Sequence, residues 1–316
     1  MKNKITLVTI ALAMMAATAF SQNFTIARHM GATLNSSVND NDATLSPNGL
    51  SLYFSSTRTD LPGAEGGSDI YVSHRPTLGS PWGIPTNLGD LNTSSNDRVL
   101  CLSLNARELF LASDRPEGQG GVDLYVSTPF PETNEGFFWT PPLNLGQPIN
   151  TELDELSAFY FEDRFVNTLI FSSNRQNGGV DYDLFMSIRN SIGTYNPPVA
   201  INELNSIGAE LRPTIRRDGL EIFIGASRPG GLGGFGTFDI WTSTRVSTSD
   251  PWNPPVLAPN INTLENDNVP SLSPDGAILY FTSNRPGSLG GLDLYSATRC
   301  SLYSAAASPS VRFTCF

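Results

Sequence analysis

The sequence predicts an all-β protein, a five-bladed β-propeller built from four-stranded blades. One motif occurs five times, and the aspartate that opens the third strand of each copy recurs at Asp69, Asp123, Asp183, Asp239 and Asp293. Each copy consists of short apolar runs separated by turns, and the chain holds 28 glycines and 23 prolines among its 316 residues. A regular repeat of this kind, made of strands and glycine turns, is typical of propeller blades.

The N-terminal segment, residues 1–21, is expected to be a cleaved signal peptide. Lys2 and Lys4 precede an apolar run from Ile5 to Ala19, and a small-residue cleavage site ends at Ser21. This pattern is typical of secretory signals. No cysteine stands at the cleavage point, so we expect a secreted or periplasmic protein without a lipid anchor. No second apolar run has the length of a membrane span, which predicts no transmembrane segment.

The repeats in residues 22–299 are expected to form one domain, because propeller blades share a closed ring of packing. In each copy, strand A precedes a Ser-Pro-Asp-Gly type of turn and strand B is the apolar run after it. In the last copy these strands are Asn268–Ser273 and Ile278–Thr282, and strand C is Asp293–Thr298. Strand D follows an aromatic–proline segment in four copies: Trp82–Leu88, Trp139–Leu145, Tyr195–Ile201 and Trp252–Leu257.

The last copy lacks a strand D after Arg299. The N-terminal stretch Phe24–Leu34 overlaps the segment Met30–Asn35, which matches the connector Asn87–Asn92 of the first copy. We therefore expect this stretch to supply the missing strand and to close the ring without an open sheet edge.

Residues 300–316 carry no repeat pattern and are expected to be an irregular tail. Cys300 and Cys315 lie at its two ends, and either a disulfide or two free thiols is compatible with an exported protein. Cys101 lies in the predicted strand A of the second blade, where we expect a buried apolar side chain.

The repeats resemble the TolB-type propeller repeat, also called the WD-like repeat of the Pro-Asp type. The resemblance covers about residues 24–299 and is clearest from Ser273 to Tyr295, with Ser-Pro-Asp-Gly, Ser-Asn-Arg-Pro-Gly and Gly-Gly-Leu-Asp-Leu-Tyr. It implies a propeller fold and an exported protein with a scaffolding or envelope role. The family's namesake has six blades and a separate N-terminal domain, and this chain shows neither.

One set of repeated charges joins an arginine in the B–C turn to the aspartate that opens strand C. Across a short loop each arginine is expected to bind its own aspartate or the turn carbonyls, stapling the blade. The alternative is a ring of ligand-binding charges. The predicted pairs are Arg58 with Asp69, Arg115 with Asp123, Arg175 with Asp183, Arg228 with Asp239, and Arg285 with Asp293.

A second set of carboxylates recurs once per copy, in the connector just before strand A. It consists of Asp40, Asp97, Glu155, Glu210 and Asp267. We expect these side chains beside the mouth of the central channel, on the face of the B–C loops. They either cap backbone amides in turns or bind a ligand that is cationic or rich in hydroxyls. Ca²⁺ is one candidate, because it prefers clustered oxygens, and no other cofactor is predicted.

Two further repeated features have a structural and a functional interpretation. The glycine-rich loops lack the Lys and Ser/Thr of a phosphate-binding loop and are interpreted as turns. Aromatic side chains before prolines act either as wedges between blades or as sugar-stacking platforms. These are Trp82, Phe138, Trp139, Tyr195 and Trp252.

Composition and missing motifs limit the function. A net charge of −11 and a pI near 4.6 argue against nucleic-acid binding. The two histidines, His29 and His74, occupy unrelated repeat positions, and no zinc or serine-hydrolase motif is present. The sequence therefore favours an exported, monomeric, non-catalytic module that binds a protein or glycan partner with its loop face.

The alternative is a glycan-processing hydrolase, because glycoside hydrolysis requires only two positioned carboxylates. Asp97, Glu155 and Glu210 are its candidates for acid and base. The uniformity of this ring argues against it, because an acid and a base need different surroundings.

Overall fold

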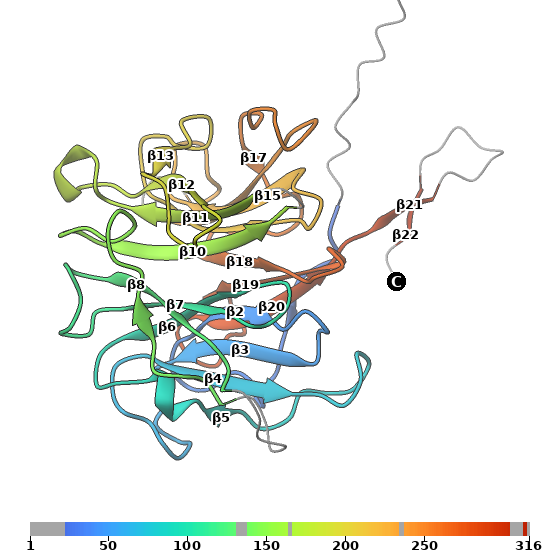
Figure 1. The fold of residues 1–316 in the computed structure, drawn as a ribbon. Helices are drawn as coiled ribbons and strands as arrows, with labels where there is room; N and C mark the ends of the chain where they lie inside the picture. Colours follow the sequence, from blue (N-terminus) through green and yellow to red (C-terminus); the bar gives the residue numbers. More distant parts are fainter. Residues whose placement is uncertain (1–22, 131–137, 164–165, 234–236, 304–311, 315–316) are drawn as a thin grey trace, which may run out of the picture.

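The computed structural model describes residues 23–130, 138–163, 166–233, 237–303 and 312–314. The predicted signal peptide, residues 1–21, lies outside them. Five antiparallel sheets of four strands each form a ring (Figure 1), which confirms the five-bladed propeller.

Four blades take their strands from consecutive stretches of the chain. Blade 1 consists of β2 (Asp40–Leu45), β3 (Ser51–Ser56), β4 (Asp69–His74) and β5 (Thr86–Asn87). Blade 2 consists of β6 (Asp97–Leu102), β7 (Leu109–Ser113), β8 (Asp123–Ser127) and β9 (Leu143–Asn144). Blade 3 consists of β10 (Glu155–Glu162), β11 (Asn167–Ser173), β12 (Asp183–Arg189) and β13 (Val199–Ala200). Blade 4 consists of β14 (Glu210–Ile215), β15 (Glu221–Ala226), β16 (Asp239–Thr244) and β17 (Val256–Leu257).

Blade 5 is completed by the N-terminus, as the sequence predicts. It consists of β18 (Asp267–Leu272), β19 (Ile278–Ser283), β20 (Asp293–Thr298) and β1 (Arg28–His29). β1 pairs antiparallel with β20, and Phe24 forms a further bridge with Arg299. The first and last strands of the ring therefore share one sheet.

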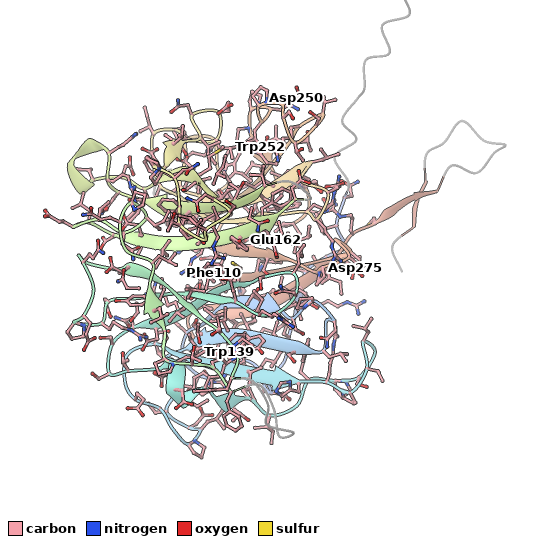
Figure 2. The ribbon with its side chains drawn as sticks, in the orientation of Figure 1. Phe110, Trp139, Glu162, Asp250, Trp252 and Asp275 are labelled. Carbon is pink, nitrogen blue, oxygen red and sulfur yellow. The ribbon has the colours of Figure 1, made fainter. Side chains whose placement is uncertain are left out.

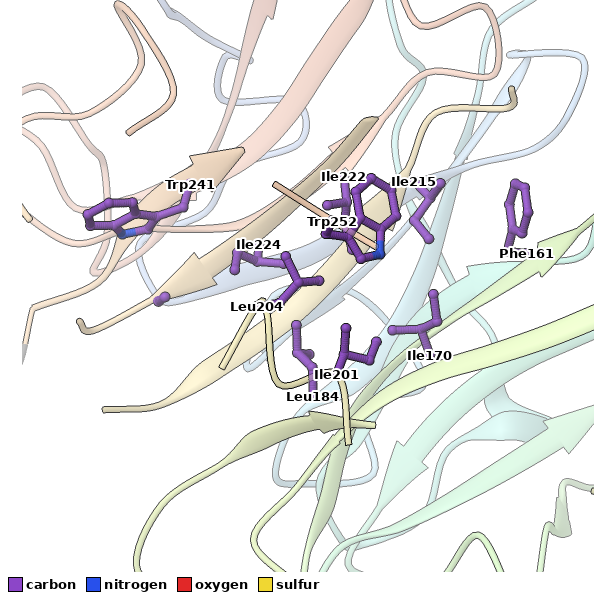
Figure 3. Close-up of a cluster of buried hydrophobic side chains, with 11 residues drawn as sticks. Phe161, Ile170, Leu184, Ile201, Leu204, Ile215, Ile222, Ile224, Trp241 and Trp252 are labelled. Carbon is purple, nitrogen blue, oxygen red and sulfur yellow. The ribbon is translucent and has the colours of Figure 1, made fainter. Parts of the chain in front are cut away.

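The blades are held together by apolar side chains between them, which is why the strands alternate poorly between apolar and polar residues. β7 and the core of β15 are buried on both sides. Figure 3 shows one such cluster, in which Phe161 and Ile170 of blade 3 meet Ile215 and Ile222 of blade 4. Trp252 belongs to the same cluster.

Every inner strand is irregular near its start. The pairing of each inner strand with its neighbour shifts register close to the carboxylate that opens the strand. In β2, β14 and β18 the third residue has a positive φ: 60° at Asp42, 54° at Arg212 and 53° at Val269. Such β-bulges bend the strand and redirect a side chain.

The described part of the C-terminal tail contains a hairpin. β21 (Ser301–Tyr303) pairs antiparallel with β22 (Arg312–Thr314), and this hairpin projects from the ring (Figure 1). Cys315 lies outside the described residues, and so does the question, left open by the sequence, of whether it pairs with Cys300. Cys101 is a buried free thiol.

Helical structure is limited to single turns in the described residues. These are η1 (Gly89–Leu91) and η2 (Asn177–Gly179). Within the described ranges, no helix is long and apolar enough to span a membrane.

Candidate functional site

The predicted ring of carboxylates is fully buried. Asp40, Asp97, Glu155, Glu210 and Asp267 are all 0% exposed. Each accepts hydrogen bonds from the amide and the hydroxyl of a Ser or Thr that precedes it in the connector. Thr93 donates to Asp97 Oδ2 from its amide at 2.6 Å and from its hydroxyl at 2.8 Å. Each side chain thus caps the turn that leads into its inner strand.

The repeated arginines bind this buried ring, which corrects the predicted pairing. Their Nη2 atoms lie 2.5–3.1 Å from a carboxylate oxygen in every blade. The pairs are Arg58–Asp40, Arg115–Asp97, Arg175–Glu155, Arg228–Glu210 and Arg285–Asp267. The physical reason is the direction in which the arginine side chain extends. From the B–C loop, the Arg115 side chain folds back over the start of strand A in its own blade, where its Nη2 also donates to the Leu91 carbonyl at 3.0 Å.

Among the described residues, none of the aspartates that open strand C forms an ion pair with these arginines. In blade 1, Asp69 accepts hydrogen bonds from the Glu65 amide at 2.9 Å and from Asn87 Nδ2 at 3.3 Å. In this way it closes the glycine-rich loop onto the outer strand. Burial is the largest cause of the raised pKa of Asp69, and the same holds for Asp183 and Asp239. The predicted arginine pairs were therefore wrong for all five aspartates that open strand C, which are Asp69, Asp123, Asp183, Asp239 and Asp293.

The contacts of the ring carboxylates hold them in ion pairs within the scaffold. A buried carboxylate in an ion pair with arginine is held in place by the high cost of separating the two charges. Within the described residues, no group of three or more His, Cys, Asp or Glu side chains has the geometry of a metal site. Ca²⁺, one candidate ligand of the ring, therefore has no cluster of this kind among the described residues.

The repeated aromatics mostly pack inside the protein. Trp139 and Trp252 are 2% and 7% exposed and belong to clusters between blades (Figure 2). Tyr195 and Trp82 pack against two further clusters. Phe138 is 48% exposed. Except at Phe138, the wedge interpretation describes their positions.

A cavity lies in the central channel, at the end opposite to the carboxylate ring. It has a volume of about 90 Å³ and is lined by inner-strand residues of all five blades and by the A–B turns that follow them. Its walls are mostly apolar and include Leu102, Phe159, Ile215 and Leu272. The ring carboxylates stand where the inner strands begin, whereas the A–B turns stand where they end. A ligand-accessible site is therefore found at the face that the sequence did not indicate.

One ion pair joins two walls of this channel. Arg212 Nη1 of blade 4 lies 2.9 Å from Asp42 Oδ1 of blade 1, and the two side chains are 10% and 2% exposed. Both residues occupy the bulge position with positive φ, which strains an arginine more than an aspartate. Burial lowers the pKa of Arg212, Asp42 opposes this shift and nearby Arg98 adds to it.

This pair breaks the symmetry of the repeat, and sequence reasoning missed it. The bulge position is the third residue of each inner strand and is occupied by Asp42, Val99, Ser157, Arg212 and Val269. Only two of these five residues are charged, and their charges are opposite. The signal was available in the aligned repeats, because a binding site must differ from the scaffold that every blade shares.

Comparisons with known proteins support the fold. No protein-family model and no curated protein matches the chain. An exo-1,5-alpha-L-arabinanase from a bovine ruminal metagenomic library is a similar solved structure, with a TM-score of 0.56 and 10% identity. That alignment covers 90% of this chain and 99% of the other.

Two further structures illustrate the range of neighbours. An alpha-L-arabinofuranosidase from Podospora anserina aligns with a TM-score of 0.54 and 13% identity over 88% of this chain and 96% of the other. A putative TolB from Agrobacterium tumefaciens aligns with a TM-score of 0.45 and 15% identity over 82% of this chain and 83% of the other. At these identities the arabinanase and the arabinofuranosidase show the propeller fold alone, and the TolB structure carries no argument at its TM-score.

Proposed function

We propose that this protein is an exported, non-catalytic propeller that binds a ligand in its central channel at the A–B turn end. The observation that carries this proposal is the Asp42–Arg212 pair, at which charge breaks the symmetry of the repeated scaffold. Export to the cell envelope or beyond is supported by the signal-peptide pattern of residues 1–21. The expected partner is a protein or glycan, and the acidic net charge disfavours nucleic acid.

The channel has rigid walls, a charged pair at its inner end and a mostly apolar lining, and these features support binding. The five inner strands hold its walls, so little ordering of the protein accompanies binding. Arg212 and Asp42 offer hydrogen-bond donors and an acceptor at the inner end. Apolar side chains line the wall from there to the mouth. Such a site can orient a polar group of the ligand and bury the apolar part of the ligand, as is usual in ligand pockets.

The test is incubation of the mature protein with a polysaccharide panel, with and without Ca²⁺. We expect mass spectrometry to find no new soluble products. Any component retained by the protein should be lost on Arg212→Met and kept on Arg107→Met, an exposed arginine on the same face outside the channel. New oligosaccharides would refute the non-catalytic function.

The second candidate is a glycoside hydrolase, and the fold comparison favours it. The similar structures include an arabinanase and an arabinofuranosidase, both of which are named as enzymes. In this chain the channel wall includes the carboxylates of Asp42 and Glu162, the latter at the end of β10 (Figure 2). Turnover that is abolished by both Asp42→Asn and Glu162→Gln, with binding retained, would establish this candidate.

A further inference from the structure

We propose that the channel binds an amphiphilic carboxylate, an organic acid whose head contacts Arg212 and whose apolar chain extends to the A–B turn mouth. This inference rests on the proposed binding function and names the chemical class of its ligand. Neither composition nor the repeat pattern points to it, because it depends on which side chains meet inside the channel.

One ion pair stands at the inner end of the channel. Arg212 has Asp42 as its ion-pair partner, and among the described residues it has no other. The cavity lining also includes Glu162 and Arg217, which stand at the A–B turn end. Arg212 is therefore the cation that a ligand reaches at the inner end.

The guanidinium of Arg212 also has unused donors. A guanidinium carries five N–H donors in a planar fork that matches a carboxylate. Among the described residues, its side chain makes the 2.9 Å contact with Asp42 and no hydrogen bond to any other group. With the side chain only 10% exposed, water has limited access to the remaining donors. A carboxylate in the channel would accept hydrogen bonds from them.

The wall between Arg212 and the mouth is mostly apolar, although Thr44, Thr214 and Ser271 also belong to the lining. Leu102, Phe159 and Leu272 are partly exposed inner-strand side chains, and Ile215 is buried beside them. From Arg212 to Ile215 the strand advances about 10 Å, at roughly 3.3 Å per residue. An apolar chain of medium length spans this distance and buries itself against the wall.

The experiment is a calorimetric titration of the mature full chain with decanoate, decan-1-ol and decylammonium. We expect saturable one-to-one binding of decanoate, at least tenfold tighter than that of the alcohol or the amine. Equal binding of decanoate and decan-1-ol, or no binding of decanoate, would overturn the inference. These titrations use the unmodified protein, so they do not depend on the folding of any variant.

Two variants are expected to change the affinity for decanoate in opposite directions, which locates the carboxylate head group of the ligand. Arg212→Met is expected to weaken decanoate binding at least tenfold. Asp42→Asn is expected to strengthen it several-fold, because the guanidinium is then free of its competing carboxylate. Arg107→Met, the matched exposed control, should leave it unchanged. Weaker binding by a folded Asp42→Asn variant would contradict the assignment of an anionic ligand.

The outcomes also separate this inference from the proposed function. Failure of decanoate to bind, together with channel-dependent retention of a panel component, would leave the binding function standing and remove the carboxylate class. New oligosaccharides from the panel would remove the non-catalytic function itself.

Discussion

At the scale of single residues, the most repeated interaction is the buried pair between an arginine of the B–C loop and the carboxylate that opens the inner strand of the same blade. In blade 2, Arg115 lies 2.6 Å from Asp97, with side-chain exposures of 9% and 0%. Removing the arginine leaves a buried carboxylate without its counter-charge. We expect Arg115→Met to lower the free energy of unfolding by about 3–5 kcal/mol, measured by chemical denaturation.

The matched control for this pair is Arg107→Met, in the A–B turn of the same blade. Arg107 is exposed, so its loss should change the free energy of unfolding by less than about 0.5 kcal/mol. A similarly small effect for Arg115→Met would mean that the hydroxyl and amide of Thr93 alone stabilise the Asp97 carboxylate.

His29 shows how one residue type replaces another at the seam of the ring. In blade 2, Asn144 accepts the Gly146 amide at 2.8 Å and donates to Asp123 at 2.9 Å. In blade 5, His29 Nδ1 accepts the Gly31 amide at 3.1 Å, and its Nε2 lies 2.8 Å from Asp293. With Nδ1 accepting, the proton belongs on Nε2, which then donates to Asp293. The two side chains thus present the same donor to the aspartate and the same acceptor to the glycine amide. They differ toward the neighbouring asparagine, since Asn150 donates to Asn144 Oδ1 at 2.7 Å whereas Asn35 Nδ2 lies 2.9 Å from His29 Nε2.

We therefore expect His29→Asn to keep the stability within about 0.5 kcal/mol, because the donor and acceptor are preserved. His29→Leu should cost about 1–3 kcal/mol, since it removes a partner from the buried Asp293 carboxylate. Thermal denaturation of the two variants tests this equivalence. A larger loss in the Asn variant would show that the ring of His29, which packs edge-on against Tyr295, matters more than its nitrogens.

The sequence located these charged residues but could not pair them correctly. Arg58 lies between Asp40 and Asp69 in the chain, and the B–C loop and the start of the inner strand share one face. Both carboxylates are therefore near the same turn. Which one the guanidinium reaches depends on how the loop folds back, which separation along the chain does not specify.

At the scale of elements, the inner-strand bulges store strain in three blades. Val269 has a φ of 53°, a region that β-branched residues rarely adopt. The same repeat position holds Val99 in blade 2, which is not among the residues with positive φ. Valine thus occupies the same repeat position with a strained backbone at Val269 and with an unstrained backbone at Val99.

We expect Val269→Asn to raise the free energy of unfolding by about 1 kcal/mol, because asparagine adopts the left-handed region at lower cost. Val99→Asn should destabilise the protein, because Val99 is fully buried in an apolar cluster. Parallel denaturation curves for the two variants provide the measurement. Destabilisation by both would show that packing outweighs backbone strain at Val269.

The closure of the ring gives a second prediction at this scale. Deleting residues 24–34 removes β1, exposes the edge of β20 and takes Phe24 out of the cluster with Phe223. Trimming residues 301–316 removes a hairpin that is not part of any blade. We expect the first deletion to lower the melting temperature far more than the second. Equal melting temperatures would contradict closure by the N-terminal strand.

The elements were the most predictable part of this protein, because five aligned copies of one motif reinforce each other. The missing outer strand after Arg299 and the matching segment Met30–Asn35 even indicated the closure. The bulges were not predictable. Asp42, Arg212 and Val269 share no side-chain property that favours a positive φ, so their conformation follows from how neighbouring blades meet.

At the scale of the whole molecule, the open end of the channel decides where function is sought. Repeated polar residues drew attention to the face where the inner strands begin, but those residues are buried in shared scaffold contacts. The cavity lies at the other end, between side chains such as Leu102 and Phe159 that resemble ordinary core residues in the sequence. Its existence depends on the radius of the closed ring, which no single repeat encodes.

The balance of buried carboxyl groups makes stability depend on pH. Burial is the largest cause of raised pKa values at Asp69, Asp183, Asp239, Glu155 and Glu210. A carboxyl group whose pKa is raised by folding binds a proton more readily in the folded state. Its contribution is fully present below the unfolded pKa, near 3.8 for Asp and 4.5 for Glu, and is lost as the pH rises through the folded value.

A second set of carboxyl groups has lowered pKa values and changes the stability in the opposite direction, at lower pH. Burial favours a raised pKa at Asp114, Asp218 and Asp275, but hydrogen bonds to their carboxylates outweigh burial and lower the pKa values. The stability that these groups provide is lost as the pH falls through folded values below 3.8. As the pH falls from neutrality, the groups with raised pKa values therefore respond before the groups with lowered ones. Acidification also reduces the repulsion within a chain of net charge −11.

We expect the melting temperature to be higher at pH 5.5 than at pH 7.5, because the carboxyl groups with raised pKa values bind protons more readily in the folded state. Asp183→Asn should reduce this difference, because Asp183 is 7% exposed and its pKa is raised by burial and by nearby Asp181. Calorimetric scans of both proteins at the two pH values provide the measurement. A lower melting temperature at pH 5.5 in the unmodified protein would contradict control of the response by the carboxyl groups with raised pKa values.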